Sequence, residues 1–263
     1  NHAYSNSVRG VYSLGAVPSS SNVIEFFDIE AGGTAADFGD LTQARQQVAG
    51  ASEANGGLND GYQGSRNTYI QGAGRAFLQG NTGPSALIQE HIIPTLGNTS
   101  SFGNLTVSRQ DSTGFASSIR AYAAGGISPS YEDEIDYYFI ATRGNAADFG
   151  NLSAAKNNVS ATSSSTRGLF AGGSGLSDVI DYVTIATTGN ATDFGNLLAA
   201  ASVYESGVSN NTTGIFAGGF TPSLQNVIQF VTIASTGNAQ DFGDLAVTKG
   251  AFGGASDGGG GLQ

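Results

Sequence analysis

A five-residue segment recurs five times along the chain and defines a repeating unit. Four copies begin with Asp-Phe-Gly, one begins with Ser-Phe-Gly, and every copy ends in Leu. The copies occupy residues 37–41, 101–105, 148–152, 193–197 and 241–245. Their first residues are separated by 64, 47, 45 and 48 positions. A period of about 20–50 residues is typical of solenoids and propellers, in which each unit needs neighbours to bury its apolar surface.

Two other segments repeat in phase with the first and predict strands. A run ending in Gly-Gly, as at 167–173 and 213–219, precedes a run of β-branched and aromatic residues, as at 179–185 and 227–233. These runs are short and bounded by Gly or Asn, which is typical of strands rather than of helices of about ten residues or more. Each unit should therefore form three or four short antiparallel strands. Since one such sheet cannot bury both faces, we predict an all-β fold, a five-bladed β-propeller of antiparallel four-stranded blades.

The repeat predicts one domain, a propeller over residues 1–257, followed by a Gly-rich tail or linker over 258–263. The five blades are expected at 2–41, 46–105, 110–152, 157–197 and 202–245. The second unit is the longest because it contains an insertion, which we place within 53–75. Segment 250–256 resembles the first strand of a further blade. Either it closes the ring beside the N-terminal strand, or the natural chain continues.

The order of these motifs resembles the kelch and galactose-oxidase-like propeller repeats. A kelch unit has an apolar strand ending in Gly-Gly, a Val-Glu-x-Tyr-like strand, an aromatic residue followed by Leu, and a basic residue. Here the corresponding parts are 170–173, 179–182, and Phe194 with Leu197, with Phe where kelch repeats usually have Trp. The form Gly-Asn-Ala-x-Asp-Phe-Gly-Asn-Leu is similar to propeller repeats in structural proteins of marine tailed phages, especially cyanophages. This resemblance implies a virion or extracellular location, although a fold alone does not determine function.

Eight of the ten basic residues fall at two equivalent positions in the repeat. One series lies four residues after the Leu, at Arg45, Arg109, Lys156 and Lys249. The other precedes the Gly-Gly strand, at Arg9, Arg75, Arg120 and Arg167. Ala201 interrupts the first series and Thr213 the second. Such repetition predicts a structural role, in which these side chains bond carbonyls and carboxylates of neighbouring blades; an anion-binding rim is the alternative.

The Asp-Phe-Gly segment itself has several possible meanings. It is the magnesium-binding triplet of protein kinases, but neither a Gly-rich phosphate loop nor a His-Arg-Asp catalytic loop accompanies it. We interpret Asn-Ala-x-Asp, which leads into the triplet, as a turn in which Asp or Asn bonds nearby amides and Gly supplies a positive φ, while Phe and Leu pack between blades. Calcium binding by the repeated Asp is an alternative. It would need about 6–8 clustered oxygen ligands, which one Asp per blade provides only around a central channel.

The composition excludes several classes of function. A net charge of −11 opposes binding to nucleic acid and to anionic membrane surfaces, and no apolar run is long enough to predict membrane insertion. With no Cys and only two His, the chain lacks the residues for thiolate chemistry or for the copper site of galactose oxidase. Glu25, Asp136 and Asp181 recur at one strand position, which we interpret as a hydrogen-bonding site rather than an acid–base pair. We expect no catalytic activity, no cofactor and no metal.

The segments that follow the Gly-Gly motif differ most between copies, and loops of this kind carry recognition. They occupy 16–22, 81–86, 127–133, 174–178 and 220–226, and should emerge on one face. The candidate ligand contacts within them are Tyr131, Glu132, Asp133 and Phe220. The insertion should add Tyr62, Arg66 and Tyr69, because amphipathic aromatic residues and Arg suit sugars or protein partners. A loop that only covers a blade or plugs the channel is equally compatible with the insertion.

These features predict a non-catalytic binding module of a virion or extracellular assembly, such as a phage tail fibre, spike or capsid decoration. It would act as an oligomer and contact a glycan or protein on a host surface, or neighbouring virion proteins. One alternative is a purely architectural spacer or cement. Another, from a different class, is a propeller hydrolase acting on polysaccharide.

Overall fold

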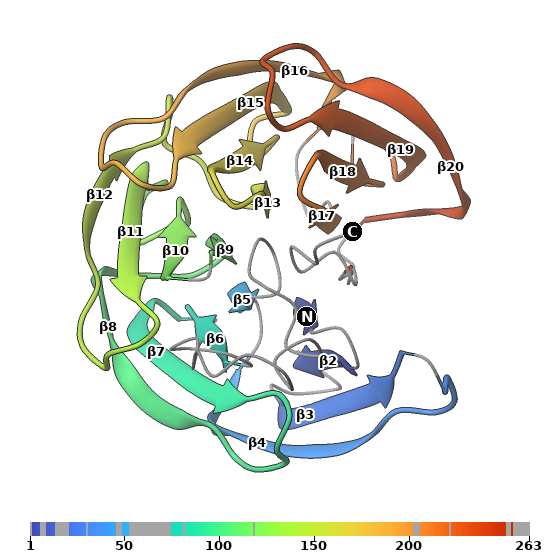
Figure 1. The fold of residues 1–263 in the computed structure, drawn as a ribbon. Helices are drawn as coiled ribbons and strands as arrows, with labels where there is room; N and C mark the ends of the chain where they lie inside the picture. Colours follow the sequence, from blue (N-terminus) through green and yellow to red (C-terminus); the bar gives the residue numbers. More distant parts are fainter. Residues whose placement is uncertain are drawn as a thin grey trace, which may run out of the picture.

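The computed structural model describes residues 2–5, 9–13, 21–29, 31–45, 49–52, 75–80, 83–117, 119–201, 206–220, 222–250 and 254. The strands in this part of the chain form five four-stranded sheets, arranged radially around a central axis (Figure 1). The fold is therefore an all-β, five-bladed propeller, as the repeat predicts. The described residues include no helix that is long and apolar enough to cross a membrane.

Each blade is an antiparallel meander whose strands lie in chain order from the centre of the ring to its rim. Blade 1 contains β1 (His2–Ser5), β2 (Arg9–Ser13), β3 (Ser21–Asp28) and β4 (Ala36–Arg45). Blade 2 contains β5 (Ala49–Ser52), β6 (Arg75–Gln79), β7 (Ser85–Ile92) and β8 (Ser100–Arg109). Blade 3 contains β9 (Thr113–Ala116), β10 (Arg120–Ala124), β11 (Glu134–Phe139) and β12 (Ala147–Asn151). Blade 4 contains β13 (Ser160–Ser163), β14 (Arg167–Ala171), β15 (Ser177–Thr184) and β16 (Thr192–Ala201). Blade 5 contains β17 (Ser206–Ser209), β18 (Thr213–Ala217), β19 (Gln225–Thr232) and β20 (Gln240–Lys249).

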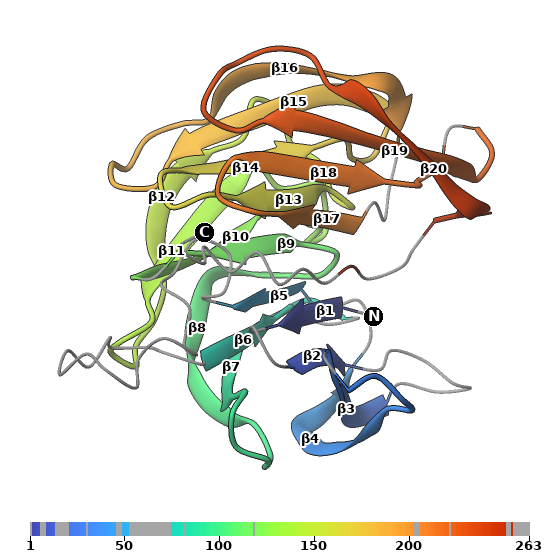
Figure 2. The ribbon, with the colours of Figure 1, turned by 45° about the vertical axis from the view of Figure 1, so that its right-hand side comes forward.

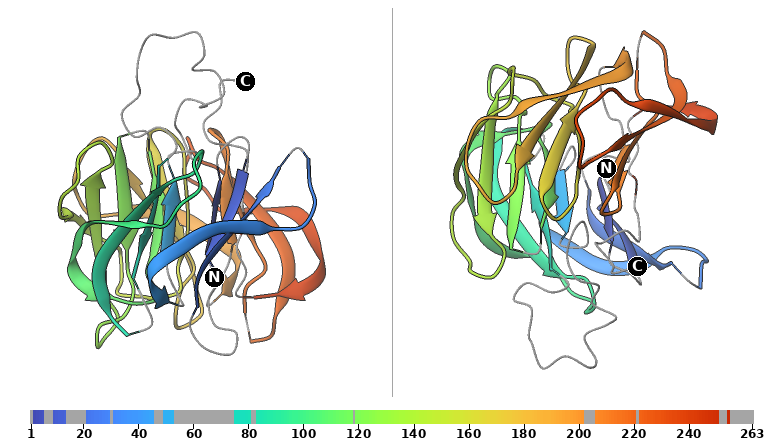
Figure 3. Two further views of the ribbon diagram at one scale, coloured as in Figure 1. Left: turned by 90° about the horizontal axis from the view of Figure 1, so that it is seen from below. Right: turned by 45° about the horizontal axis from the view of Figure 1, so that its top comes forward.

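The connections of a meander alternate between the two ends of the ring, which Figure 3 shows from the side. The connection between the second and third strands of each blade follows the Gly-Gly motif and lies at one end. The link from each blade to the next leaves from the same end, because the outermost strand runs back toward it. We call this end the loop face. The expected segments 16–22 and 81–86 lie partly outside the described residues, as does the proposed further strand at 250–256.

The Phe-Gly segment lies within the outermost strand of each blade and not in a turn. In blade 3 the pairing register shifts at Asp136, so that Phe149 is an extra residue in β12, a β-bulge. Gly150 has a φ of 146°, and a Cβ on it would lie 2.4 Å from the carbonyl oxygen of Gly189 in the next blade. The predicted turn therefore does not extend over the Asp-Phe-Gly triplet, although Asn145 and Ala146 lie in the connection before β12 and the positive φ predicted for the Gly is confirmed. The segment needs Gly for a bulged strand in close contact with its neighbour.

The Phe and Leu of the repeat are buried between successive blades, as predicted, in four of the five copies. The Phe side chains of blades 1–4 are between 2% and 4% exposed. Phe149 and Leu152 of blade 3, for example, share a buried cluster with Val183 and Ile185 of blade 4. In blade 5, by contrast, Phe242 is 61% exposed. The core is therefore a series of interblade layers, and the fifth copy of the repeat is not covered in the same way.

Candidate binding surface

The Arg series that precedes the Gly-Gly strand connects each blade to the next. Nη1 of each Arg donates a hydrogen bond of 2.8–3.1 Å to the carbonyl oxygen of the Ile that follows the third strand of the next blade. The pairs are Arg9–Ile93, Arg75–Ile140, Arg120–Ile185 and Arg167–Ile233. Two of the guanidinium groups also lie 4.7 Å from the ring centroids of Tyr137 and Tyr182. These contacts confirm the predicted structural role of the series.

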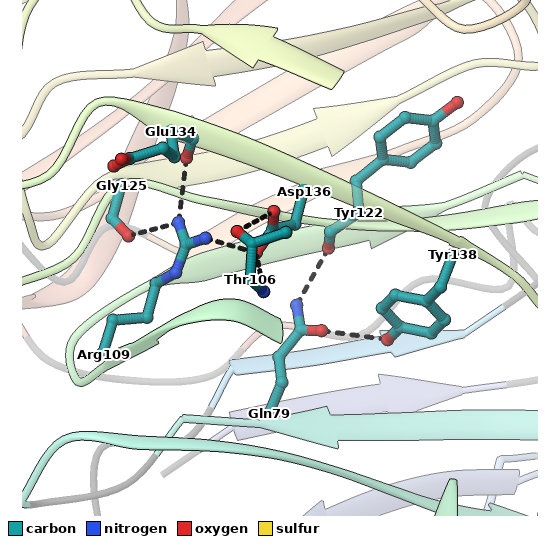
Figure 4. A network of polar contacts seen from close by, with 8 residues as sticks. All are labelled: Gln79, Thr106, Arg109, Tyr122, Gly125, Glu134, Asp136 and Tyr138. Atoms are coloured by element: carbon teal, nitrogen blue, oxygen red, sulfur yellow. Dashed lines mark hydrogen bonds and ion pairs between the residues drawn. The ribbon is translucent and has the colours of Figure 1, made fainter. Parts of the chain in front are cut away.

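The second basic series takes part in a buried polar network, which Figure 4 shows between blades 2 and 3. Arg109 and Asp136 form an ion pair in which both side chains are completely buried. Nη1 of Arg109 also donates to the carbonyl oxygens of Gly125, at 3.2 Å, and Glu134, at 2.9 Å. Asp136 accepts hydrogen bonds from the backbone N–H of Thr106, at 3.1 Å, and from its hydroxyl, at 2.5 Å. The recurring carboxylate is thus a hydrogen-bonding position at the blade interface, as predicted.

The same position is charged in one interface and neutral in another. Lys156 and Asp181 form the equivalent pair between blades 3 and 4, with 3.0 Å between the ammonium nitrogen and the carboxylate. Between blades 4 and 5, Ala201 replaces the basic residue and Gln229 the acid. There the backbone N–H of Leu198 donates to the side-chain oxygen of Gln229 at 2.8 Å. In these interfaces the position supplies an acceptor for a backbone amide, and the two carboxylates each pair with a basic residue of the preceding blade.

A second part of the network in Figure 4 was not predicted from the sequence. The amide nitrogen of Gln79 donates to the carbonyl oxygen of Tyr122, and its amide oxygen accepts from the Tyr138 hydroxyl, both at 2.9 Å. Burial raises the pKa of Tyr138 well above its usual value. The sequence carried one indication of this contact: Gln79 ends β6, whereas blades 3, 4 and 5 have Ala at the end of the corresponding strand.

The acidic segment of blade 3 lies on the loop face and has a fixed backbone. The N–H of Glu132 donates to the carbonyl oxygen of Gly126 at 2.9 Å. The carbonyl oxygen of Asp133 accepts from the N–H of Leu152 at 2.7 Å. Tyr131, between these anchored residues and the tip of the loop, is 49% exposed. The loop therefore presents an aromatic side chain from a backbone that is hydrogen bonded to the rest of the blade.

The three consecutive acids influence one another electrostatically. Partial burial, followed by the hydrogen bond to Glu134 and the charge of that residue, raises the pKa of Glu132. The positive charge of Arg109 lowers this pKa. Glu132 and Asp133 are both partly exposed. This segment therefore adds negative potential beside Tyr131, which favours hydroxyl or cationic groups in a ligand.

Polar atoms that the sequence analysis missed lie on the same face, in the links that lead to the innermost strands β9 and β13. The amide nitrogen of Asn157 donates to one carboxylate oxygen of Asp111 at 3.4 Å. The other Asp111 carboxylate oxygen, the Asn157 amide oxygen and the Ser112 hydroxyl are buried and lack a hydrogen-bond partner among the described residues. Burial raises the pKa of Asp111, and the bond from Asn157 opposes that rise. Buried oxygens of this kind need a donor from water or a ligand.

Phe220 lies on the loop face of blade 5, where its side chain is 42% exposed. It pairs across its loop with Leu224, which is also exposed. Blade 4 lies between this loop and the loop of Tyr131 (Figure 1). The structure thus puts Tyr131 and Phe220 on one face without bringing them into contact, so they would serve a ligand as two separate sites.

The insertion is attached to the opposite end of the ring. It joins Ser52, which is opposite Ala76 in the sheet, to Arg75, whereas the connection after the Gly-Gly position leaves β6 from its other end. Because a meander alternates its ends, the attachment points contradict our expectation that the insertion extends the loop face. Tyr62, Arg66 and Tyr69 themselves lie outside the described residues.

Over the described part of the chain, no group of three or more His, Cys, Asp or Glu residues is arranged to hold a metal ion. No protein-family model matches the chain, and no curated protein matches it.

Proposed function

We propose that this protein is a non-catalytic binding module whose loop face contacts a glycan. The observation that carries the proposal is the contrast between the repeated residues and the loop face. The two Arg and Lys series and the recurring carboxylates form bonds between blades. The loop face instead carries side chains that differ from blade to blade, with exposed Tyr131 and Phe220. A rigid ring with distinct side chains on one face suits a ligand that binds in one orientation.

The chemistry of this face favours a sugar as the ligand. An exposed Tyr ring offers an apolar surface for a pyranose ring and a hydroxyl at its edge. The carboxylates of Glu132 and Asp133 add further acceptors beside Tyr131. This combination of an aromatic ring and carboxylate acceptors suits polyhydroxyl compounds.

The location we propose is a virion or another extracellular assembly, such as a phage tail fibre, spike or capsid decoration. Support comes from the resemblance of the repeats to kelch units and to propeller repeats of marine tailed phages. In that setting the ligand is a glycan on the host surface. An architectural spacer would have the same ring but no ligand on the loop face.

A glycan array probed with the whole chain tests this function. Truncation of one aromatic anchor typically costs about 2 kcal/mol, or roughly thirtyfold in affinity. Tyr131→Ala and Phe220→Ala should therefore each weaken binding of glycans that contact their loop. Phe139→Ala is the matched control, because Phe139 is 45% exposed but ends β11 at the opposite end of the ring.

Three outcomes would contradict the proposal. Failure of the wild-type protein to bind any glycan would favour the architectural role. Release of reducing sugar from a polysaccharide would favour a hydrolase. If Tyr131→Ala and Phe220→Ala bind glycan as well as the wild type does, and Phe139→Ala loses binding, the site lies at the other end of the ring.

A further inference from the structure

The outermost strand of blade 5 exposes a set of side chains that are buried in the other blades. Phe242 is 61% exposed and Lys249 is also exposed, whereas the equivalent Arg109 and Lys156 are buried. Leu245 is half-buried, although the equivalent Leu residues of the other four blades are buried. We call Phe242, Leu245 and Lys249 the blade-5 face. A Cβ on Gly243 would meet no atom of the described residues within 4 Å, so none of them covers this bulge.

Blade 1 exposes the opposite half of the same kind of interface. Glu25, Phe27 and Ile29 alternate along one side of β3 and the residue after it, and all three are partly exposed. The equivalent residues are buried in each of the other four blades, as Asp181, Val183 and Ile185 are in blade 4. We call Glu25, Phe27 and Ile29 the blade-1 face.

The two faces belong to blades that are separated in the ring. Figure 1 shows an open side between β20 and the outer strands of blade 1, and Figure 2 shows the same separation from another direction. The exposed fraction of the Phe242 side chain agrees with this view, as does the open space beside Gly243. Within one chain, therefore, neither face is covered by the other.

The internal interfaces show how such faces combine. Between blades 3 and 4, Phe149 and Leu152 pack with Val183 and Ile185. In the same interface Lys156 forms its ion pair with Asp181. By repeat position, Phe242 and Leu245 would meet Phe27 and Ile29, and Lys249 would meet Glu25. Both the apolar pairs and the charge pair are complementary, so each face is a suitable partner for the other.

We propose that the blade-5 face of one copy binds the blade-1 face of a second copy, head to tail. Closure within one chain would require the four internal interfaces to shift. Each of them is held by an Arg–carbonyl hydrogen bond and by a Gly N–H that donates to the Phe carbonyl of the preceding blade. Packed interfaces of this kind resist such deformation, whereas a second copy needs no internal change. A heterologous contact leaves one face free at each end, so it extends into a larger ring or a helical filament.

Two substitutions make this contact weaker than the internal ones. Thr213 stands where the other blades have the Arg that bonds the next blade. Thr34 stands where the other blades have an Asn, such as Asn190, whose side-chain oxygen accepts the N–H of Asn151 at 3.1 Å. The association should therefore be reversible. Thr213→Arg should tighten it about tenfold, because a hydrogen bond from a charged donor contributes about 1.5–3 kcal/mol.

Sedimentation velocity of the whole chain, from micromolar to near-millimolar concentration, tests the contact. We expect the mass of the wild type to rise with concentration. Phe242→Asp blocks the blade-5 face and Ile29→Asp the blade-1 face, so each variant alone should remain monomeric. Their equimolar mixture should form a dimer and nothing larger. The Phe242→Asp variant keeps its blade-1 face and the Ile29→Asp variant keeps its blade-5 face, so only one contact can form. Ile119→Asp is the matched control: Ile119 is 62% exposed in the β9–β10 turn, and its replacement should leave association unchanged.

The proposal is overturned if the wild type stays monomeric throughout this range, as it would if the ring closed within one chain. It is also overturned if the mixture of one-face variants fails to associate while both remain folded by circular dichroism. If Ile29→Asp does not fold, Thr213→Arg provides an independent test. An unchanged association constant in that variant would contradict the proposed register.

Discussion

Removal of Arg109 from the interface between blades 2 and 3 should destabilise the protein strongly. In Arg109→Ala, Asp136 would keep its two hydrogen bonds from Thr106 but lose its buried counter-ion. The carbonyl oxygens of Gly125 and Glu134 would also lose a donor. Breaking a buried pair from one side typically costs about 3–5 kcal/mol, because the remaining charge is uncompensated. We therefore expect the free energy of unfolding to fall by about 4 kcal/mol.

The chain itself supplies the compensating change. Between blades 4 and 5 the same position carries Ala201 with Gln229, a neutral pair that still accepts a backbone N–H. The double variant Arg109→Ala/Asp136→Gln transfers this arrangement to blades 2 and 3. It removes the uncompensated charge and keeps an acceptor for the Thr106 amide. Its loss of stability should be smaller than the sum of the two single losses by about 2 kcal/mol, the coupling expected of contacting residues.

Urea denaturation, followed by circular dichroism, measures these differences as changes in midpoint at constant slope. Leu96→Ala, an exposed substitution elsewhere in blade 2, is a suitable control. Additive losses in the double variant would refute the argument, since they would mean that the two side chains do not interact. A decrease of less than about 1 kcal/mol in the free energy of unfolding of Arg109→Ala would refute it as well, because an uncompensated buried charge should cost more than that.

Two further predictions concern stability. Gly150→Ala should cost clearly more than Gly243→Ala, because both positions have a φ near 145° but only the first Cβ would collide with the next blade; equal shifts in melting temperature would contradict this. Burial lowers the pKa of His91 from 6.5 to about 4, so the unfolded chain is protonated first as the pH falls. The free energy of unfolding should then drop between pH 6.5 and 4, by up to about 3 kcal/mol, and His91→Val should remove this component. An unchanged pH dependence of the urea midpoint in that variant would refute the assignment.

The candidate site was only partly accessible from the sequence. Variation between copies singled out the loops of Tyr131 and Phe220 because the repeat offers four internal comparisons for each position. The same comparison had no means of marking Asp111 or Asn157, whose importance arises from burial beside each other. It also expected the insertion to extend the loop face, whereas the attachment points Ser52 and Arg75 lie at the other end of the ring, because the end from which a connection leaves depends on strand order and not on composition.

The sequence by itself determined the number of blades, the strand content of each and the role of the Arg series. These follow from local patterns, since short β-branched runs bounded by Gly can bury their faces only against further copies. Only the tertiary structure decided that the Phe-Gly segment is a bulged strand, because the bulge depends on pairing with the third strand. It alone also distinguished Phe242 from its four buried counterparts. The five copies are nearly identical as sequence, and the burial of each one depends on which blade follows it in space.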